Sequence, residues 1–273
     1  AEIFACLQGY RDLGVISENL IRPDFSFGIL KGKSGCGKSS YLKAGLLAEL
    51  AKTEAHRGIY LKFSNLDSLE TIREAFIDSL KLPKADIETL NFLELLNKGI
   101  EAVSQSCPNF QSLILIFDQF EQFFVYTDDQ ARREAFIQDL ATWYNNDELT
   151  DKIKILVSIR EDWFARMDEI QQRLNYTLKI GSHTGGNSFY LKNFSAEEAT
   201  IILAVMAKED LGIEENDIER FDNPYIQEVL ERDLASPTDR LISPVDLQII
   251  AETIKQQNTS EMRSFTRQAF QRL

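Results

Sequence analysis

The hydrophobic residues of the chain follow two patterns that alternate up to about residue 194. Largely apolar runs, which are typical of strands buried on both faces, lie at 25–30, 58–63, 113–118, 152–159 and 189–191. Apolar residues at helical spacing fill the stretches between these runs, at 42–50, 69–80, 89–103 and 131–144. Strands that alternate with helices predict a parallel sheet with helices on both faces.

The pattern changes after residue 194, where only helical spacing remains. Ser195 and Glu198 form the capping-box pattern S-x-x-E at the start of the first helix. Pro224 and Pro244 each suit the first turn of a further helix, where the missing N–H costs nothing. The predicted domains are therefore a sheet domain over residues 1–194 and a small helical domain over residues 195–273.

Smaller local signals complete this pattern. A lead-in helix over 16–21 is expected to end at Pro23, and Thr89 is expected to cap the helix that runs to residue 103. His183 is predicted to be a solvated loop residue. The aromatic residues that follow the third strand are predicted to pack in the core, and they are Phe120, Phe123, Phe124 and Tyr126.

The loop between the first strand and the first helix carries the pattern G-x-x-x-x-G-K-[ST]. Its backbone N–H groups and the positive end of the helix dipole converge on one point, so the loop is a predicted polyphosphate site. Lys38 should reach the β and γ phosphates, and the Ser39 hydroxyl should ligate Mg²⁺. The residues expected to bind the nucleotide here are Gly32, Lys33, Ser34, Gly35, Cys36, Gly37, Lys38, Ser39 and Ser40.

Three charged residues at strand ends are the next candidates. Asp118 ends the third strand, where ligands bind open α/β sheets, and is predicted to hold Mg²⁺ through water. Glu121 could orient the water that attacks the γ phosphate, or it could form an ordinary salt bridge. Arg160 ends the fourth strand and could sense the γ phosphate, or it could pair with Glu161 or Asp162.

Composition narrows the partners. The 273 residues suffice for one large and one small domain, and 44% apolar residues suffice for a core. The formal charge of −13 and the scattered Lys and Arg residues argue against nucleic acid or an anionic membrane as the main partner. Cys6, Cys36 and Cys107 have no paired spacing, so a reducing, cytoplasmic setting without a metal cluster is expected.

Neither a signal peptide nor an apolar run long enough to span a bilayer is present in the sequence. The chain begins at Ala1 without Met, so it resembles a piece cut from a longer protein.

Five segments, in their order and spacing, carry a family likeness. They are GKSGCGKSSYLKAGLL, LILIFDQFEQFF, ILVSIREDW, FYLKNFSAEEA and ISPVDLQII. Together they resemble the STAND P-loop NTPases, especially the novel STAND branch. The resemblance implies an α/β fold related to AAA+ and other ASCE ATPases: a three-layer αβα domain with sheet order 5-1-4-3-2, followed by a small all-α lid domain.

The same resemblance assigns roles to two residues. Pro244 matches the proline that lies near the nucleotide base, and Arg160 matches the arginine that ends the sensor strand. One departure is that Asp118 is not followed directly by an acid, because the second carboxylate comes at Glu121. Efficient ATP turnover is therefore not expected.

The resemblance implies a switch controlled by ATP, ADP and Mg²⁺, with sensor and effector domains outside this segment. Such a switch would form homo-oligomers when triggered and serve signal transduction or antiviral defence. Three alternatives stay open: a nucleotide-bound scaffold without turnover, a phosphotransferase with a small-molecule acceptor, and an AAA+ ATPase that remodels nucleic acid. The extra strand and the terminal helices count against the second, and the acidic balance counts against the third.

Overall fold

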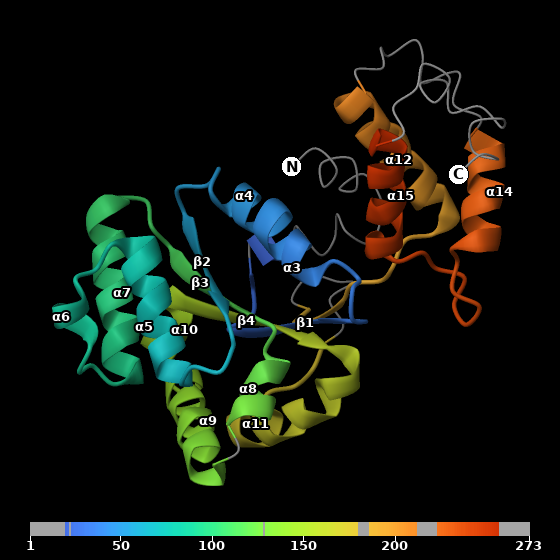
Figure 1. Cartoon of the computed structure of the whole chain (residues 1–273). Helices are drawn as coiled ribbons and strands as arrows, with labels where there is room; N and C mark the ends of the chain where they lie inside the picture. The colour runs from blue at the N-terminus through green and yellow to red at the C-terminus, as the bar shows by residue number, and fades with distance from the viewer. Residues whose placement is uncertain (1–19, 22, 128, 180–185, 212–222, 257–273) are drawn as a thin grey trace. The chain divides into compact units, whose positions relative to one another are not determined.

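The computed structural model describes residues 20–21, 23–127, 129–179, 186–211 and 223–256. The larger of its two compact units contains a five-stranded sheet (Figure 1), made of β1 (Phe27–Gly32), β2 (His56–Lys62), β3 (Ser112–Asp118), β4 (Ile153–Arg160) and β5 (Ser188–Tyr190). All neighbouring strands are parallel, and their order is β2-β3-β4-β1-β5. The predicted order 5-1-4-3-2 is confirmed, because it is this order read from the other edge.

The helices between the strands largely follow the predicted periodicity. They are α3 (Lys38–Ser40), η1 (Tyr41–Leu46), α4 (Leu47–Leu50), α5 (Ser68–Leu80), α6 (Lys84–Ile87), α7 (Phe92–Ser106), α8 (Glu121–Tyr126), α9 (Gln130–Tyr144), α10 (Asp147–Lys152), η2 (Glu161–Arg166) and α11 (Met167–Leu174). The predicted helix after the loop is present as three consecutive pieces, and its middle piece, η1, is π-helical. The short helices α6 and α10 were not predicted.

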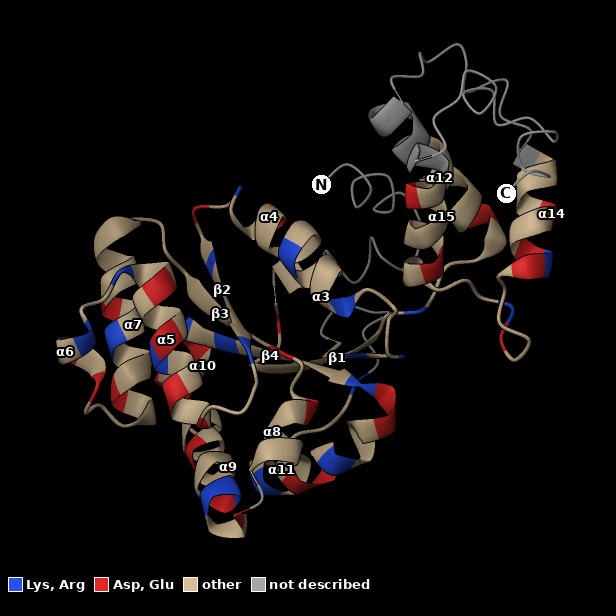
Figure 2. Cartoon of the chain, in the orientation of Figure 1, with Lys and Arg blue, Asp and Glu red and all other residues tan. Residues whose placement is uncertain are grey.

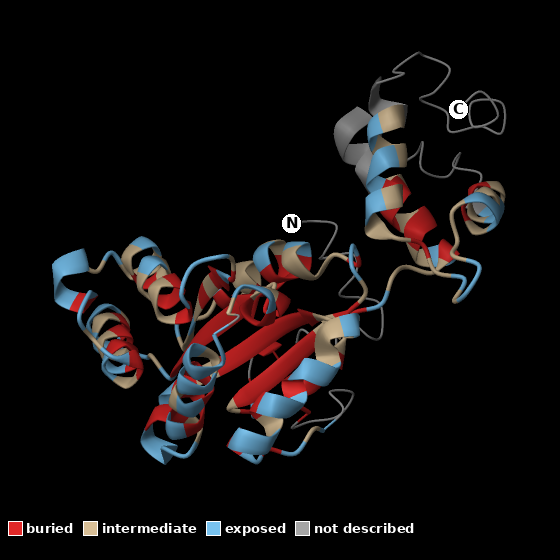
Figure 3. Ribbon diagram, turned by 60° about the horizontal axis from the view of Figure 1, so that its bottom comes forward, coloured by how far each residue is buried: buried red, intermediate tan, exposed pale blue. Residues whose placement is uncertain are grey.

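The two faces of the sheet are covered by different helices. Alternate strand residues, such as Leu61, Phe117 and Val157, join one hydrophobic core with residues of α5, α7, α8, α9 and α11. The other face packs against the segment 38–50, since a Cβ added to Gly58 of β2 would lie 2.6 Å from Leu47. Figure 3 shows the strands of this sheet as buried. The double burial explains why the strands are almost continuously apolar in sequence.

Two local predictions are wrong. The helix that was expected to start at Thr89 is capped instead by Asn91, whose side chain accepts from the Glu94 N–H at 3.0 Å. The Glu94 carboxylate accepts from the Asn91 N–H at 2.9 Å, which completes a capping box. Tyr126 is 56% exposed and lies outside the core, although the other three aromatic residues of that cluster are buried.

A second compact unit comprises Lys33–Gly37 and the chain from Lys192, while the first holds the rest of the sheet region up to Leu191. The second unit contains α12 (Ala196–Leu211), α14 (Asn223–Asp233) and α15 (Pro244–Gln256). The predicted capping box is present: the Ser195 N–H donates to Glu198 at 2.7 Å, and the Glu198 N–H donates to Ser195 at 3.2 Å. The sequence did not predict that the five loop residues Lys33–Gly37 would belong to the same compact unit as these helices.

Two further predictions fall on residues that are not described. Most of the lead-in helix over 16–21, His183 and most of the loop around it lie outside the described ranges. Among the helices that are described, none has both the length and the apolar character needed to cross a membrane. Figure 2 shows acidic and basic residues interspersed over α5, α7, α9 and α11, in line with the scattered charges of the sequence.

Candidate nucleotide-binding site

The loop between β1 and α3 has the backbone geometry that its glycines allow. Gly35 has a φ of 78° and Gly37 a φ of 87°, in the left-handed region that favours glycine. Successive amides can then turn toward one point, as in anion-binding nests. The Lys38 ammonium donates to the carbonyl oxygen of Gly32 at 2.8 Å, so the lysine lies across the loop that it follows.

The loop also meets the start of α15 within the second unit. A Cβ added to Gly37 would lie 3.6 Å from Cγ of Pro244, and one added to Gly35 would lie 3.7 Å from Cγ2 of Val245. The Lys33 ammonium forms an ion pair with Asp239. Two segments that the sequence analysis assigned to the nucleotide, the loop and Pro244, are therefore neighbours.

Asp118 lies at the carboxyl end of β3 and is almost fully buried, with 1% of its surface exposed. Its Oδ2 accepts a hydrogen bond of 2.6 Å from the phenol of Tyr60 on β2. The Ser39 hydroxyl lies near this phenol as well, since it lowers the pKa of Tyr60. The two predicted magnesium ligands, Ser39 and Asp118, thus both neighbour the Tyr60 phenol.

The surroundings keep the Tyr60 phenol protonated. Burial is the main cause that raises the pKa of Tyr60, and the hydrogen bond and negative charge of Asp118 raise it further. The Ser39 hydroxyl lowers the pKa by a smaller amount. Tyr60 is therefore a hydrogen-bond donor to Asp118 at neutral pH.

The oxygen atoms at this edge suit a magnesium nucleotide. A hydroxyl and a carboxylate are hard oxygen ligands, and Mg²⁺ commonly takes only one or two protein ligands together with phosphates and water. Within the described residues, no group of three or more His, Cys, Asp or Glu side chains gathers around a metal position. A cation here would therefore depend on the phosphates of the nucleotide.

Ser158 on β4 gives a second indication. Its side chain is fully buried, and its Oγ has no hydrogen-bond partner among the described residues. Phe117 and Val157 pair across β3 and β4, and both belong to the apolar core. The next residue on each strand, Asp118 and Ser158, therefore lies on the opposite face of the sheet. An orphaned buried hydroxyl next to Asp118 is consistent with a site that a ligand or its water completes.

Glu121 is held at the same edge. It is 6% exposed, and its carboxylate accepts from the backbone N–H of Arg160 at 3.3 Å. The turn before it is tight, since Gln119 has a φ of 55° and the Phe120 N–H donates to the Ser158 carbonyl at 2.9 Å. The described residues give Glu121 no ion pair, so the salt bridge considered from the sequence is not formed there.

Arg160 forms an ion pair with Asp162, which is one of the two alternatives that the sequence left open. Its guanidinium pairs with Asp162 through two contacts of 3.0 and 2.6 Å. The side chain is 40% exposed, and ion pairs of this kind contribute little to stability. Arg160 would have to leave Asp162 to reach a phosphate, at a small cost.

Sequence reasoning missed Tyr60 as a member of the site. The signal that could have identified it is alternation: Lys62 pairs with Asp118 across β2 and β3, so Tyr60 lies on the same face as Asp118. The sequence alone does not show this, because the register between β2 and β3 comes from the structure.

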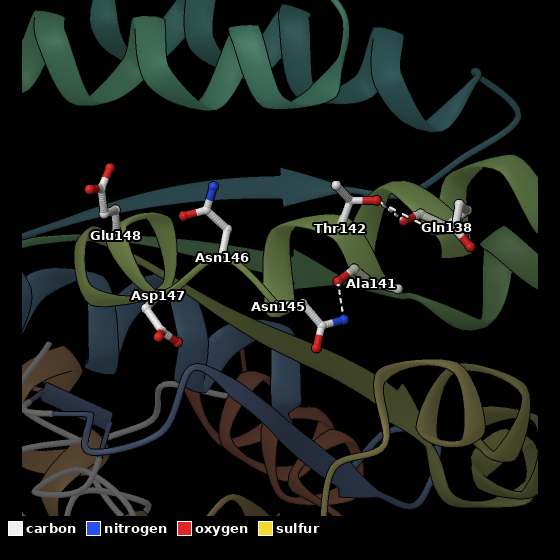
Figure 4. Close-up of a pocket in the computed structure, with 7 residues that line it drawn as sticks. All are labelled: Gln138, Ala141, Thr142, Asn145, Asn146, Asp147 and Glu148. Atoms are coloured by element: carbon white, nitrogen blue, oxygen red, sulfur yellow. Dashed lines mark hydrogen bonds between the residues drawn. The ribbon is translucent and has the colours of Figure 1, made fainter.

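A separate hollow of about 600 Å³ lies where α9 meets α10 (Figure 4), and the residues that line it are Gln138, Ala141, Thr142, Asn145, Asn146, Asp147 and Glu148. Its amide groups are used at helix ends: Asn145 Nδ2 donates to the Ala141 carbonyl at 2.8 Å, and Asn146 Oδ1 accepts from the Leu149 N–H at 3.2 Å. These contacts explain the polar lining, and no chemistry is assigned to it.

Comparison with known families gives one match. The family described as Novel STAND NTPase 1 matches residues 13–223, which is more than half of the chain. The matched range contains the loop, Asp118, Glu121 and Arg160. No curated protein matches the chain.

Several solved structures have a similar fold. The ORC2 protein of Aeropyrum pernix, solved with ADPNP and ADP, is 14% identical with a TM-score of 0.59, and the match covers 91% of this chain and 66% of that one. Drosophila ORC bound to DNA is 17% identical with a TM-score of 0.58, over 96% of this chain and 65% of that one. A Walker-type ATPase of Pyrococcus abyssi is 15% identical with a TM-score of 0.52, over 93% and 75%.

At these identities the likeness concerns the fold, which is that of an α/β P-loop ATPase. The chain spans slightly less than two thirds of the first two proteins.

Proposed function

Because the chain belongs to the Novel STAND NTPase 1 family, we propose that this NTPase module binds ATP and hydrolyses it slowly, and that its nucleotide state controls domain closure and oligomerisation. The observation that carries the proposal is that Asp118, which accepts a hydrogen bond from Tyr60, and Ser39, which follows the loop, both neighbour the Tyr60 phenol. It supports a shared magnesium position for the hydroxyl and the carboxylate.

Each residue has a role in this proposal. Lys38 and the loop amides hold the phosphates, and Ser39 and Asp118 hold Mg²⁺, which when bound neutralises phosphate charge. Glu121 orients the attacking water. Arg160 exchanges its pairing with Asp162 for the γ phosphate.

The loop contacts support a route from nucleotide to helices. Lys33 and Gly37 contact Asp239 and Pro244 within the unit that holds α12, α14 and α15. A loop that rearranges around phosphates would change these contacts, and order and packing changes of this kind drive nucleotide switches. We propose that the helices act as a lid over the nucleotide, with Pro244 near the nucleotide base. The whole protein would then serve signalling or defence, with its sensor and effector domains outside this segment.

The first test is ATP binding by Lys38→Ala, measured by calorimetry in the presence of MgCl₂. Loss of a charged contact worth about 1.5–3 kcal/mol should weaken affinity roughly ten- to hundred-fold. Lys52→Ala is the matched control, because it removes the same charge from an exposed residue that pairs only with Glu49 among the described contacts. Equal ATP affinity of Lys38→Ala and wild type would contradict the proposal.

A scaffold without turnover is the second candidate, and one observation favours it: the Glu121 carboxylate is already bonded to the Arg160 backbone. Single-turnover hydrolysis by wild type and Glu121→Gln separates the two. A switch ATPase should lose hydrolysis in the variant and keep its ATP affinity. Equal, negligible rates in both proteins would favour the scaffold.

A further inference from the structure

We propose that Tyr60 is a positioning residue of the magnesium–nucleotide site, whose phenol aligns Ser39 and Asp118 for one cation. The inference rests on the proposed function and deepens it. Tyr60 itself contacts neither phosphate nor metal in this arrangement. It acts through the two ligands that it joins.

The hydrogen-bond directions carry the argument. A phenol has one proton to donate, and Asp118, as a carboxylate, can only accept, so the proton of Tyr60 lies in the 2.6 Å bond to Asp118. Ser39 can therefore hydrogen-bond to the phenol oxygen only as a donor, in line with its lowering of the Tyr60 pKa. In such a bond the proton of Ser39 points toward Tyr60, and its oxygen lone pairs stay available to a cation.

Asp118 is fixed in the same way. The bond to Tyr60 occupies part of Oδ2, and a carboxylate offers about four acceptor positions, so capacity remains for a metal or its water. Bonds between a hydroxyl and a charged carboxylate are short and strong, which limits rotation of the carboxylate. The phenol therefore sets the orientation of both ligands at once.

Tyr60 is itself held from two sides. Its strand is paired with β3 through the register Lys62 to Asp118. On the other side, the Lys43 ammonium of η1 lies 4.5 Å from the centre of the Tyr60 ring, a cation–π contact. Strand and helix thus fix the phenol, as is required of a residue that orients metal ligands.

The test is Tyr60→Phe, which keeps the ring and removes only the oxygen. ATP affinity is measured over a series of free Mg²⁺ concentrations and again in EDTA. Loss of a residue that hydrogen-bonds to metal ligands typically lowers metal affinity ten- to hundred-fold. We expect the Mg²⁺ concentration at half-maximal effect to rise about ten- to hundred-fold, with affinity in EDTA unchanged.

Two further variants keep the result interpretable. Tyr144→Phe removes a phenol from another partly buried tyrosine, on α9, and should leave the Mg²⁺ dependence unchanged. Lys43→Met keeps the phenol and removes the cation above its ring, so a smaller shift in the same direction is expected. Lys43→Met also tests the inference if Tyr60→Phe does not fold.

Three outcomes would overturn the inference. One is an unchanged Mg²⁺ dependence in Tyr60→Phe, or in Lys43→Met where only that variant folds. Another is an equal loss of ATP affinity with Mg²⁺ and with EDTA, which would make Tyr60 a support of the loop. If wild type itself shows no Mg²⁺-dependent ATP binding, the proposed function fails as well, so the two failures are distinguishable.

Discussion

The two faces of the central sheet differ in chemistry although the same strands form both. Leu61, Phe117 and Val157 belong to an apolar core to which the helices from α5 to α11 contribute. One residue away along the same strands, Tyr60, Asp118 and Ser158 bring polar groups to the opposite face. A shift of one residue in a strand reverses the face, so this alternation separates the part that stabilises the fold from the part that can bind a nucleotide.

The energetic consequences of the two faces also differ. On the apolar face, the Phe63 ring lies 5.1 Å from Phe117 and 4.9 Å from Phe120, distances at which aromatic pairs stabilise beyond their buried area. On the other face, a buried hydroxyl such as that of Ser158 costs stability when it has no partner. Mutations on the two faces should therefore affect different measurements.

The largest expected effect is from Phe76→Ala on the apolar side. Phe76 of α5 is fully buried, and its removal should lower the free energy of unfolding by about 3–5 kcal/mol. Urea denaturation measures this loss. The ATP affinity of the folded protein should equal that of wild type, because Phe76 belongs to the core on the face opposite Tyr60 and Asp118. A comparable loss of ATP affinity would show that the faces are not independent.

A glycine on each side gives the next comparison. A Cβ at Gly99 of α7 would lie 2.5 Å from the Phe76 ring, which cannot move easily, so Gly99→Ala should destabilise by about 1–3 kcal/mol. A Cβ at Gly58 would instead meet the side-chain ends of Leu47 and Leu50, at 2.6 and 2.9 Å. Leu47, the nearer of the two, is only partly buried and can move, so Gly58→Ala should cost less stability.

For ATP affinity we expect the opposite ranking, with the larger effect in Gly58→Ala. Leu47 and Leu50 belong to the helical segment that begins with Lys38, so displacing them in Gly58→Ala should weaken ATP binding. Gly99→Ala should leave ATP binding unchanged. Thermal unfolding and calorimetry on both variants check the pair, and an ATP affinity reduced only in Gly99→Ala would be the contrary result.

Much of the fold could be predicted because local patterns specify it. Five apolar runs separated by helical spacing correspond to five parallel strands, and the order followed from the family likeness. Asn91 shows the limit of local reading: Thr89 is also a good cap residue, but Asn91 and Glu94 together match the capping box, a signal that was present in the sequence.

The site was predictable only where its residues form a motif. The loop and Asp118 have sequence signatures, whereas the contact from Tyr60 to Asp118 depends on the pairing of strands 58 residues apart. The ion pair of Lys33 with Asp239 spans 206 residues. Periodicity carries no information about such pairs, because it describes each element alone.

The smallest expected effect comes from the start of α7, a helix of the apolar face. Asn91→Ala removes the side chain that satisfies the Glu94 N–H, and should cost about 1 kcal/mol of unfolding free energy. Thr89→Ala is the control, since Thr89 is exposed and precedes the helix, and its effect should stay within about 0.5 kcal/mol.

Urea denaturation of both variants decides between the two caps. The cap holds the first turns of α7, in which Phe92, Leu95 and Leu96 are buried. ATP affinity should be unchanged in both variants, as for other changes on this face. If Thr89→Ala were the more destabilising substitution, α7 would begin earlier in solution than Phe92, and Asn91 would not be its cap.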